Sequence, residues 1–279
     1  MGDKPILVLG ATGGQGGAVV TGLLERGVRV RALARDPLGS AARRLARRGV
    51  QVMRGALDDA SSLVVAMTGT AGVFALTTPF GNGVDAEIHQ GRAILTAAGK
   101  ALVPHLVFSS VACSGQRTGV PHFESKAWVE FELPACGVPY TVLGPTSFFE
   151  NLLAGRDRIR GGILDLPLPA DRPLQQLARS DLGAFAAEVL LRPDAYAGQR
   201  IELAGDVVTP AKMAATLTRI LGRPVRHERT PLEAIADPDM RAMWRFLDDP
   251  GYQVDALALH LAHPEIPWTS FTGWALKAF

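Results

Sequence analysis

A glycine-rich segment near the N-terminus has the spacing of a phosphate-binding loop. It follows directly on an apolar run at residues 6–9 and reads Gly10-Ala11-Thr12-Gly13-Gly14-Gln15-Gly16-Gly17. Such a turn needs residues without a Cβ, because the backbone must approach a phosphate and the next helix must pack closely on the strand. The first amides of that helix then face a pyrophosphate, which the helix dipole also favours. The segment therefore predicts a dinucleotide site formed by residues 10–16.

The residues after the second apolar run predict which dinucleotide is bound. Proteins that bind NAD usually carry Asp or Glu here, which accepts hydrogen bonds from the ribose hydroxyls. This chain instead has Arg35, whose guanidinium can form a fork on a 2′-phosphate and stack on adenine. We therefore expect NADP(H) as the cofactor. Asp36 leaves an alternative open, because it could pair with Arg35 or allow NAD to bind.

Short apolar runs alternate regularly with helical patterns over the first half of the chain, and the candidate site residues lie between them. Six short runs rich in Val, Ile and Leu lie at residues 6–9, 28–33, 50–53, 72–76, 106–109 and 140–143. Strands that alternate with crossover helices form a parallel sheet covered on both faces. The sequence thus predicts an α/β fold with a Rossmann-type doubly wound parallel sheet, its NAD(P)-binding core spanning residues 1–145.

The rhythm changes after Pro145, where proline and glycine become frequent and the apolar runs become irregular. We expect residues 146–279 to add further sheet strands and a smaller C-terminal substrate-binding lobe, within one continuous structural domain. Two helix starts are predicted here: one capped by Ser180 with Asp181 in the first turn, the other capped by Thr209 before Pro210.

Composition places the chain among soluble globular proteins. It has 279 residues, of which 47% are hydrophobic and 20% charged, a net charge of +2 and two cysteines. The balanced charge argues against a nucleic-acid partner, and two cysteines are too few for a disulfide framework. No apolar run is long enough to span a bilayer, and no secretory signal is evident. We therefore expect a cytoplasmic protein that needs neither membrane nor metal.

Several motifs in this order and spacing resemble the NmrA-like family, atypical members of the short-chain dehydrogenase/reductase superfamily. They are the glycine loop, Arg35-Asp36-Pro37, Pro121-His122-Phe123-Glu124-Ser125-Lys126 and Ser147-Phe148-Phe149-Glu150-Asn151-Leu152-Leu153. The resemblance covers most of the chain, including residues 243–246 and 269–274. It implies either an NADPH-dependent reductase, or a protein that binds NADP(H) without turnover and acts as a redox sensor or a partner of transcription factors.

The catalytic motif of typical superfamily members is Tyr-x-x-x-Lys, and this chain departs from it. The lysine is Lys126, which we expect to contact the nicotinamide ribose or carboxamide, but the residue four positions earlier is His122. An ordinary alcohol dehydrogenase is therefore disfavoured. His122 could donate a proton to the substrate, or simply pack or cap at the start of its helix. The positive charge of Lys126 nearby disfavours the donor role.

Residues at the carboxyl ends of the strands are candidates for the ligand crevice, where open α/β sheets bind their ligands. Ser109 and Ser110 end the fifth strand, where the superfamily often places a substrate-orienting serine, although serines also end strands to satisfy backbone groups. The resemblance assigns further cofactor contacts to Leu57, Asp58, Thr77 and Thr78. The family pattern Gly-Asp-x-x-Asp is here Gly-Ala-Leu-Asp-Asp, so its first acid is absent.

By the same resemblance, the residues after the sixth strand lie at the nicotinamide end of the cofactor. These are Phe148, Phe149, Glu150 and Asn151. The aromatic pair either walls the nicotinamide and, through Phe149, the substrate, or belongs to the core of the lobe. The aromatic residues that could close the cleft from the lobe are Trp244, Phe246, Trp268, Phe271 and Trp274.

Together these features predict an NADPH-dependent reductase that transfers hydride to a small electrophile such as a quinone or a conjugated carbonyl. Such an acceptor delocalises the incoming charge and needs less help from a strong acid than a simple ketone does. The alternative is a non-catalytic NADP(H)-binding redox sensor that binds a protein partner. An open apolar cleft would favour the enzyme, and a cleft filled by side chains the sensor. The missing Tyr–Lys pair argues against a sugar-nucleotide epimerase. Either a monomer or a homodimer is compatible with the sequence.

Overall fold

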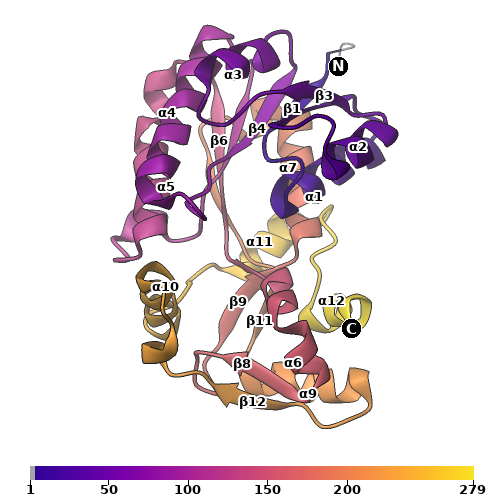
Figure 1. Cartoon of the computed structure of the whole chain (residues 1–279), viewed down its shortest axis with the longest axis vertical. Coiled ribbons are helices and arrows are strands. Elements are labelled where there is room, and N and C mark those ends of the chain that lie inside the picture. The colour runs from indigo at the N-terminus through magenta and orange to yellow at the C-terminus, as the bar shows by residue number, and fades with distance from the viewer. Residues whose placement is uncertain (1–3) are drawn as a thin grey trace.

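The computed structural model describes residues 4–279, in which one large sheet and two small sheets form an upper and a lower half (Figure 1). Every strand pair of the large sheet is parallel, in the order β10-β6-β5-β4-β1-β2-β3. The predicted doubly wound parallel sheet is confirmed. Its strands are β1 (Ile6–Val8), β2 (Val30–Ala34), β3 (Gln51–Arg54), β4 (Gly72–Leu76), β5 (Leu106–Ser109), β6 (Tyr140–Pro145) and β10 (Arg200–Leu203).

The central strands β1, β4 and β5 are almost wholly apolar because helices cover both faces of the sheet, whereas β2 and the edge strands β3 and β10 carry charged residues. In β1, Ile6 and Val8 pack on one face with α1 and α7, whereas Leu7 packs on the other with α3 and α4. The helices of the upper half are α1 (Gly14–Glu25), α2 (Ser40–Arg47), α3 (Ala60–Met67), α4 (Gly83–Lys100), α5 (Pro121–Glu132) and α7 (Arg179–Leu191).

Helix α7 belongs to the second half of the sequence but packs against α1 of the first half (Figure 1). The two helices approach so closely that a Cβ on Gly183 would lie 2.4 Å from the carbonyl oxygen of Ala18. A Cβ on Gly22 would lie 2.6 Å from the carbonyl oxygen of Gly183. Glycine at both positions therefore permits this crossing, which fixes the start of α7 relative to the start of α1.

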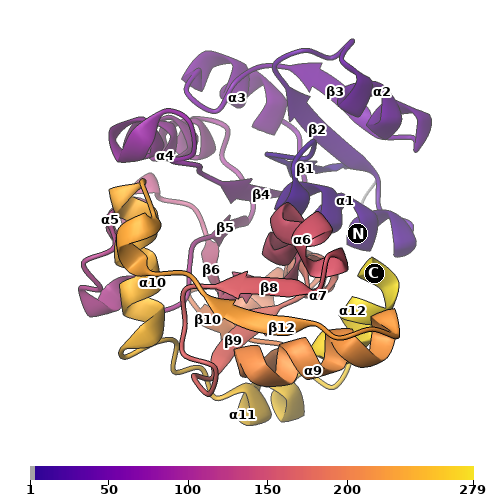
Figure 2. The same cartoon turned by 60° about the horizontal axis from the view of Figure 1, so that its bottom comes forward.

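The lower half is built on a three-stranded sheet, β11-β9-β7, and a parallel pair, β12-β8 (Figure 2). Its core is rich in aromatic residues and includes Phe149, Phe246, Phe271 and Trp274. Its strands are β7 (Ser147–Phe148), β8 (Ile163–Leu166), β9 (Leu174–Leu177), β11 (Asp206–Val208) and β12 (Arg226–Arg229). The remaining helices are α6 (Arg156–Arg160), α8 (Pro193–Tyr196), α9 (Pro210–Leu221), α10 (Pro238–Asp248), α11 (Ala256–Ala262) and α12 (Phe271–Ala278).

One of the two predicted helix starts is confirmed and the other is wrong. Thr209 caps α9, because its side chain accepts a hydrogen bond from the N–H of Lys212. Helix α7, however, begins at Arg179, and Ser180 lies inside its first turn, where the hydroxyl donates to Asp181. Asp181 is fully buried and accepts two bonds from Thr269, at 2.6 Å from its N–H and 2.7 Å from its Oγ1. A residue expected to favour the helix dipole thus also anchors the C-terminal segment.

Across residues 4–279, no helix combines the length and the apolar character that crossing a bilayer requires.

Candidate functional site

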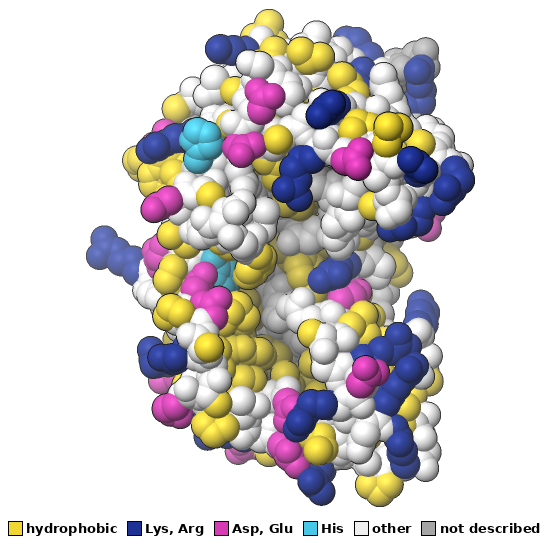
Figure 3. All heavy atoms as spheres, viewed as in Figure 1, with side chains coloured by type: hydrophobic (Ala, Val, Ile, Leu, Met, Phe, Trp, Pro, Cys, Tyr) yellow, Lys and Arg dark blue, Asp and Glu magenta, His cyan; other side chains and the backbone are white. Residues whose placement is uncertain are grey.

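A cleft of about 870 Å³ separates the two halves of the molecule (Figure 3). It lies at the carboxyl ends of β1, β2, β4, β5 and β6, where the crevice was expected. The sheet side contributes mostly backbone and polar side chains, and the lobe side contributes mostly apolar ones. The cleft therefore has the two surfaces that a polar cofactor and an apolar second ligand would need.

The glycine loop forms one end of the cleft. Gly10 has a φ of +65°, and a Cβ on Gly16 would lie 2.3 Å from the carbonyl oxygen of Gly10, so the loop closes tightly on itself. Helix α1 then begins without a side-chain cap, which leaves its first N–H groups available to a ligand. Of the predicted loop residues, Ala11 and Gly16 do not line the cleft; those that do are Gly10, Thr12, Gly13, Gly14 and Gln15.

Arg35 follows β2 and lies exposed at the edge of the cleft. The neighbouring Asp36 does not pair with it; instead, its carboxylate accepts a hydrogen bond of 2.9 Å from the N–H of Leu38. Within residues 4–279 the Arg35 guanidinium has no hydrogen bond or ion pair, so its fork remains available to an anion.

Leu57 and Asp58 also line this end of the cleft, together with the backbone of Gly55 and Ala56. The acid that follows Asp58 serves the fold instead, because Asp59 caps α3 by accepting hydrogen bonds from the N–H groups of Ser61 and Ser62. The segment therefore places one acid toward a ligand and uses the other to begin a helix.

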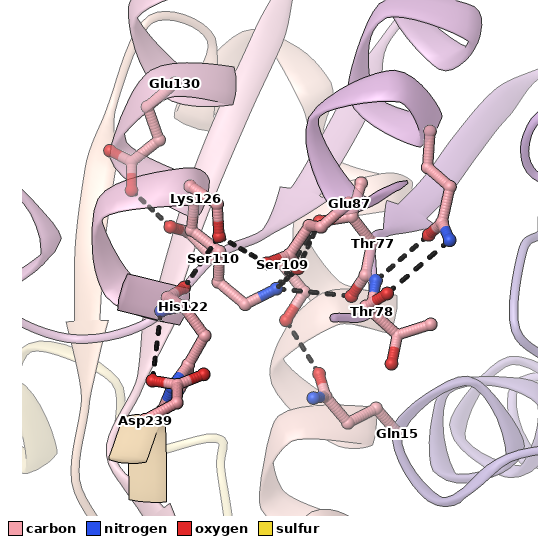
Figure 4. A network of polar contacts seen from close by, with 12 residues as sticks. Gln15, Thr77, Thr78, Glu87, Ser109, Ser110, His122, Lys126, Glu130 and Asp239 are labelled. Atoms are coloured by element: carbon pink, nitrogen blue, oxygen red, sulfur yellow. Dashed lines mark hydrogen bonds and ion pairs between the residues drawn. The ribbon is translucent and has the colours of Figure 1, made fainter. Parts of the chain in front are cut away.

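Lys126 lies at the centre of a polar network below the sheet (Figure 4). Its Nζ is 2.7 Å from Oε1 of Glu87 and 3.2 Å from the carbonyl oxygen of Thr77. Glu87 is fully buried on α4 and also accepts hydrogen bonds from the hydroxyls of Thr77 and Ser125. Gln90, one turn further along α4, bonds both the N–H and the carbonyl oxygen of Thr78. Thr77, Thr78 and Lys126 all line the cleft and are held there by α4.

His122 and Lys126 lie on the same helix, α5, but each has its own carboxylate partner. Nδ1 of His122 is 2.6 Å from Oδ1 of Asp239, a residue of α10 in the lobe (Figure 4). A carboxylate accepts only, so Nδ1 carries the proton of this bond and Nε2 is left for another partner. Within the described chain Nε2 has no such partner, and the ring lines the cleft. His122 is paired with Asp239, whereas Lys126 is paired with Glu87.

The two serines after β5 have different environments. Ser109 is buried, does not line the cleft and donates a hydrogen bond of 2.8 Å to Oε1 of Gln15. Ser110 does line it, and its hydroxyl donates to Glu130, which also accepts from Ser114 (Figure 4). Ser109 thus orients a side chain of the glycine loop, and only Ser110 can contact a substrate.

The aromatic pair after β6 is divided between the cleft and the core. Phe148 lines the cleft, but Phe149 is fully buried in the lobe, where it stacks on Trp274. Phe149 therefore takes the second of its two expected places, the core of the lobe, because the chain leaves β7 after Phe148 and Phe149 begins a 3-10 helix that packs there. Asn151 lines the cleft, whereas Glu150 does not.

Glu150 instead replaces the missing cap of α7. Its two carboxylate oxygens each accept from the N–H of Arg179 at 3.2 Å. Burial raises the pKa of Glu150, and the N–H and positive charge of Arg179 oppose that rise. The predicted cofactor contact is thus a structural residue.

The lobe wall of the cleft is mostly apolar, and its polar or charged members are Thr146, Ser147, Asn151, Arg158, Asp165, Gln176 and Arg179. Of the five aromatic residues expected to close it, Trp244 alone lies there; Phe246, Phe271 and Trp274 are in the lobe core, and Trp268 stacks on His260. Burial raises the pKa of the Tyr252 phenol, so this group stays neutral. Other apolar members of the wall include Phe123, Leu164, Leu166, Met240 and Met243.

Sequence reasoning missed several residues of the site, among them Glu87, Gln90, Arg179 and Asp239. Glu87 carries a local signal, because it occupies the buried stripe of α4 with Gly91, Ile94 and Ala98. A carboxylate on such a stripe needs a buried cation. Asp239 and Arg179 carry none, since only the tertiary fold brings them to the cleft.

Comparison with known proteins identifies relatives of the whole chain. A model of the NmrA-like family matches residues 2–258. An NAD(P)H azoreductase of Xenophilus azovorans is 31% identical over 230 residues, which cover 82% of this chain and 78% of the relative. A (4-alkanoyl-5-oxo-2,5-dihydrofuran-3-yl)methyl phosphate reductase of Streptomyces griseus is 32% identical over 234 residues, with the same coverage of 82% and 78%.

Among solved structures, the NADPH-dependent quinone oxidoreductase QOR2 of Escherichia coli, complexed with NADPH, has the same fold. It superimposes with a TM-score of 0.83 over 98% of this chain and 99% of that chain, at 23% sequence identity.

Proposed function

This chain belongs to the NmrA-like family, and we propose that it is an NADPH-dependent reductase that transfers hydride to a quinone or a conjugated carbonyl compound. The observation that carries the proposal is the single cleft in which an uncapped helix start, a free guanidinium and an apolar wall meet. The azoreductase and the furanone-phosphate reductase support it, because both names describe reduction of a conjugated small molecule.

The residues present fit NADPH. The glycine loop is a cradle that a Cβ would fill, and it leads into backbone N–H groups suited to a pyrophosphate. Arg35 supplies the fork for a 2′-phosphate, and Asp36, turned toward Leu38, does not neutralise it. When bound, the cofactor supplies the hydride. Lys126, Thr77 and Asn151 border the part of the cleft that we assign to the nicotinamide half.

The apolar lobe wall supports a flat, uncharged acceptor. Trp244, Met243 and Tyr252 offer polarizable and aromatic surface, which packs well against conjugated rings. Of the charged lobe residues at the cleft, Arg158 and Asp165 pair with each other, and Arg179 packs on the glycine loop at the cofactor end. Such a wall excludes water and holds the acceptor mainly by shape.

His122 is the proton donor in this proposal. Asp239 fixes the imidazole by its bond to Nδ1, which directs Nε2 toward the substrate. When the ring is doubly protonated, Nε2 carries the second proton, which can pass to the oxygen or nitrogen on which negative charge develops and leave the neutral ring with its proton on Nδ1. Lys126 is a positioning group, because its ammonium is held by Glu87 and Thr77.

The test is NADPH oxidation, followed by the loss of nicotinamide absorbance, against a panel of quinones, enones, azo compounds and aliphatic ketones. We expect steady turnover with the conjugated acceptors and little with the ketones. Tight NADPH binding without turnover of any acceptor would contradict the reductase and favour a nucleotide sensor. In that case partner affinity should differ between NADPH and NADP⁺. The open apolar cleft favours the enzyme over the sensor.

A further inference from the structure

Arg179, the first residue of α7, is the only arginine from the second half of the described chain that reaches the glycine loop. A Cβ placed on Gly14 would lie 2.4 Å from its Nη1, 2.6 Å from Cζ and 2.8 Å from Nε. The guanidinium therefore packs on the Cα of Gly14, the residue at which α1 begins.

The Arg179 side chain is held in place without using its hydrogen-bond donors. The ring of Phe148 lies 5.7 Å from Cζ, and Gly14 covers the group from the loop side. Glu150 is near, but it bonds the N–H of Arg179 and makes no hydrogen bond to the guanidinium. Within residues 4–279 the guanidinium donates to no acceptor, and its Nε is buried without a partner. A charged fork is thus held in a defined position and left unsatisfied.

Apart from the Glu150 carboxylate, which attracts the Arg179 charge, the electrostatic surroundings of the guanidinium are positive. The start of α1 has the positive end of the helix dipole, no side-chain cap and no acidic residue in its first turn. The Arg179 guanidinium therefore places a positive charge beside the positive end of the α1 dipole. One anion bound at the loop could accept from the backbone N–H groups and from the guanidinium, and would satisfy both sets of donors at once.

We propose that Arg179 is a second cofactor-binding cation, which contacts the pyrophosphate from the lobe side while the glycine loop contacts it through backbone N–H groups. This inference rests on the proposed function. It divides the recognition of NADPH between two arginines. Arg35 contacts the 2′-phosphate, which NADH lacks, and Arg179 contacts the pyrophosphate, which both coenzymes share.

Equilibrium titration of NADPH and NADH tests this division. We expect Arg179→Ala to raise the Kd of both coenzymes by a similar factor, about ten- to a hundredfold, the loss of a charge-assisted hydrogen bond. Arg179→Lys, which retains the charge and loses the fork, should give a smaller rise for both. Arg35→Ala should weaken NADPH alone. Adenosine 2′-phosphate, which has no pyrophosphate, should bind the Arg179→Ala protein as well as it binds the unaltered chain.

Arg156→Ala is the matched control. Arg156 is also a partly buried arginine of the lobe with an unpartnered Nε, and its guanidinium lies 6.0 Å from the ring of Phe279, but it does not line the cleft. Its replacement should leave both dissociation constants unchanged. Thermal unfolding of each variant identifies any loss of binding that comes from misfolding.

Two results would overturn the inference alone: unchanged affinities in the Arg179→Ala protein, or weakening of NADPH without weakening of NADH, which would assign Arg179 to the 2′-phosphate. If the unaltered chain binds neither coenzyme, the proposed function itself fails and this inference fails with it.

Discussion

The Nζ atom of Lys126 lies 2.7 Å from Oε1 of Glu87, a carboxylate that is 0% exposed. The same side chain accepts hydrogen bonds from Thr77 and Ser125, so one carboxylate joins α4, the end of β4 and α5 (Figure 4). The position of the lysine in the cleft is therefore set by a residue far from it in the sequence.

Glu87→Gln should destabilise the protein by about 3 kcal/mol, because it leaves a buried ammonium without its counter-ion. Lys126→Met should cost a similar amount, since it leaves the carboxylate unpaired. The double variant, Glu87→Gln with Lys126→Met, should cost clearly less than the sum of the two. Urea unfolding monitored by tryptophan fluorescence measures all three. Additive losses would show that the two side chains are not energetically coupled.

Asp239→Asn should lower kcat by about ten- to a hundredfold and leave KM nearly unchanged, because it disturbs the orientation of His122 rather than the binding surfaces. Asp248→Asn is the control: Asp248 lies on the same helix but pairs with Arg229, away from the cleft. Steady-state kinetics with the best quinone of the panel measures both. A rise in KM at constant kcat would instead assign Asp239 to substrate binding.

Arg35→Ala should raise the Kd for NADPH by about tenfold or more and leave that for NADH unchanged, because the variant loses the fork on the 2′-phosphate. Arg43→Ala removes an exposed arginine of α2 that does not line the cleft and should change neither value. Fluorescence titration of the two coenzymes distinguishes the cases. If the Arg35→Ala protein bound NADPH as tightly as the unaltered chain does, the assignment of Arg35 to the 2′-phosphate would be refuted.

Gly183→Ala should destabilise the fold by about 1–3 kcal/mol, because the new methyl group meets the backbone of α1 at 2.4 Å. Gly17→Ala is the matched helical substitution: its Cβ would lie at 3.5 Å from the nearest atom, an ordinary contact. It should be neutral or stabilising by up to about 1 kcal/mol. Thermal and urea unfolding compare the two, and similar effects at both positions would rule out the close crossing as the cause.

The native protein should expose one reactive thiol to an aromatic disulfide reagent at mildly alkaline pH. Burial raises the pKa of Cys113, which is 1% exposed, so little thiolate forms there and the reagent cannot reach it. Cys136 is partly exposed and should react. Unfolding should release the second equivalent. Rapid reaction of both thiols in the native state would contradict the placement of Cys113.

The sheet and the glycine loop could be predicted because their signals are local. Each of the six apolar runs forms a strand, and the central strands β1, β4 and β5 are apolar because they are buried on both faces. Gly10 and Gly16 carry the loop because a Cβ at Gly16 would meet the backbone of Gly10 itself, a few residues away.

The errors arose where distant parts of the chain decide the outcome. Ser180 has the right type for a cap, but Glu150 caps the helix from another element. Phe149 could face the cleft or the core, and the packing of Trp274 decided for the core. Asp239 lies 117 residues from His122 in the sequence, and no local pattern around either residue predicts their hydrogen bond.

The close crossing of α1 and α7, with β10 beside β6, limits how such a protein can be recombined. A chimera joined at residue 145 would leave β6 as an unprotected sheet edge and strip α1 of its cover. Exchange of one acceptor-binding half for another should therefore preserve α7 and β10 of the parent and graft only the lobe segments before α7 and after β10.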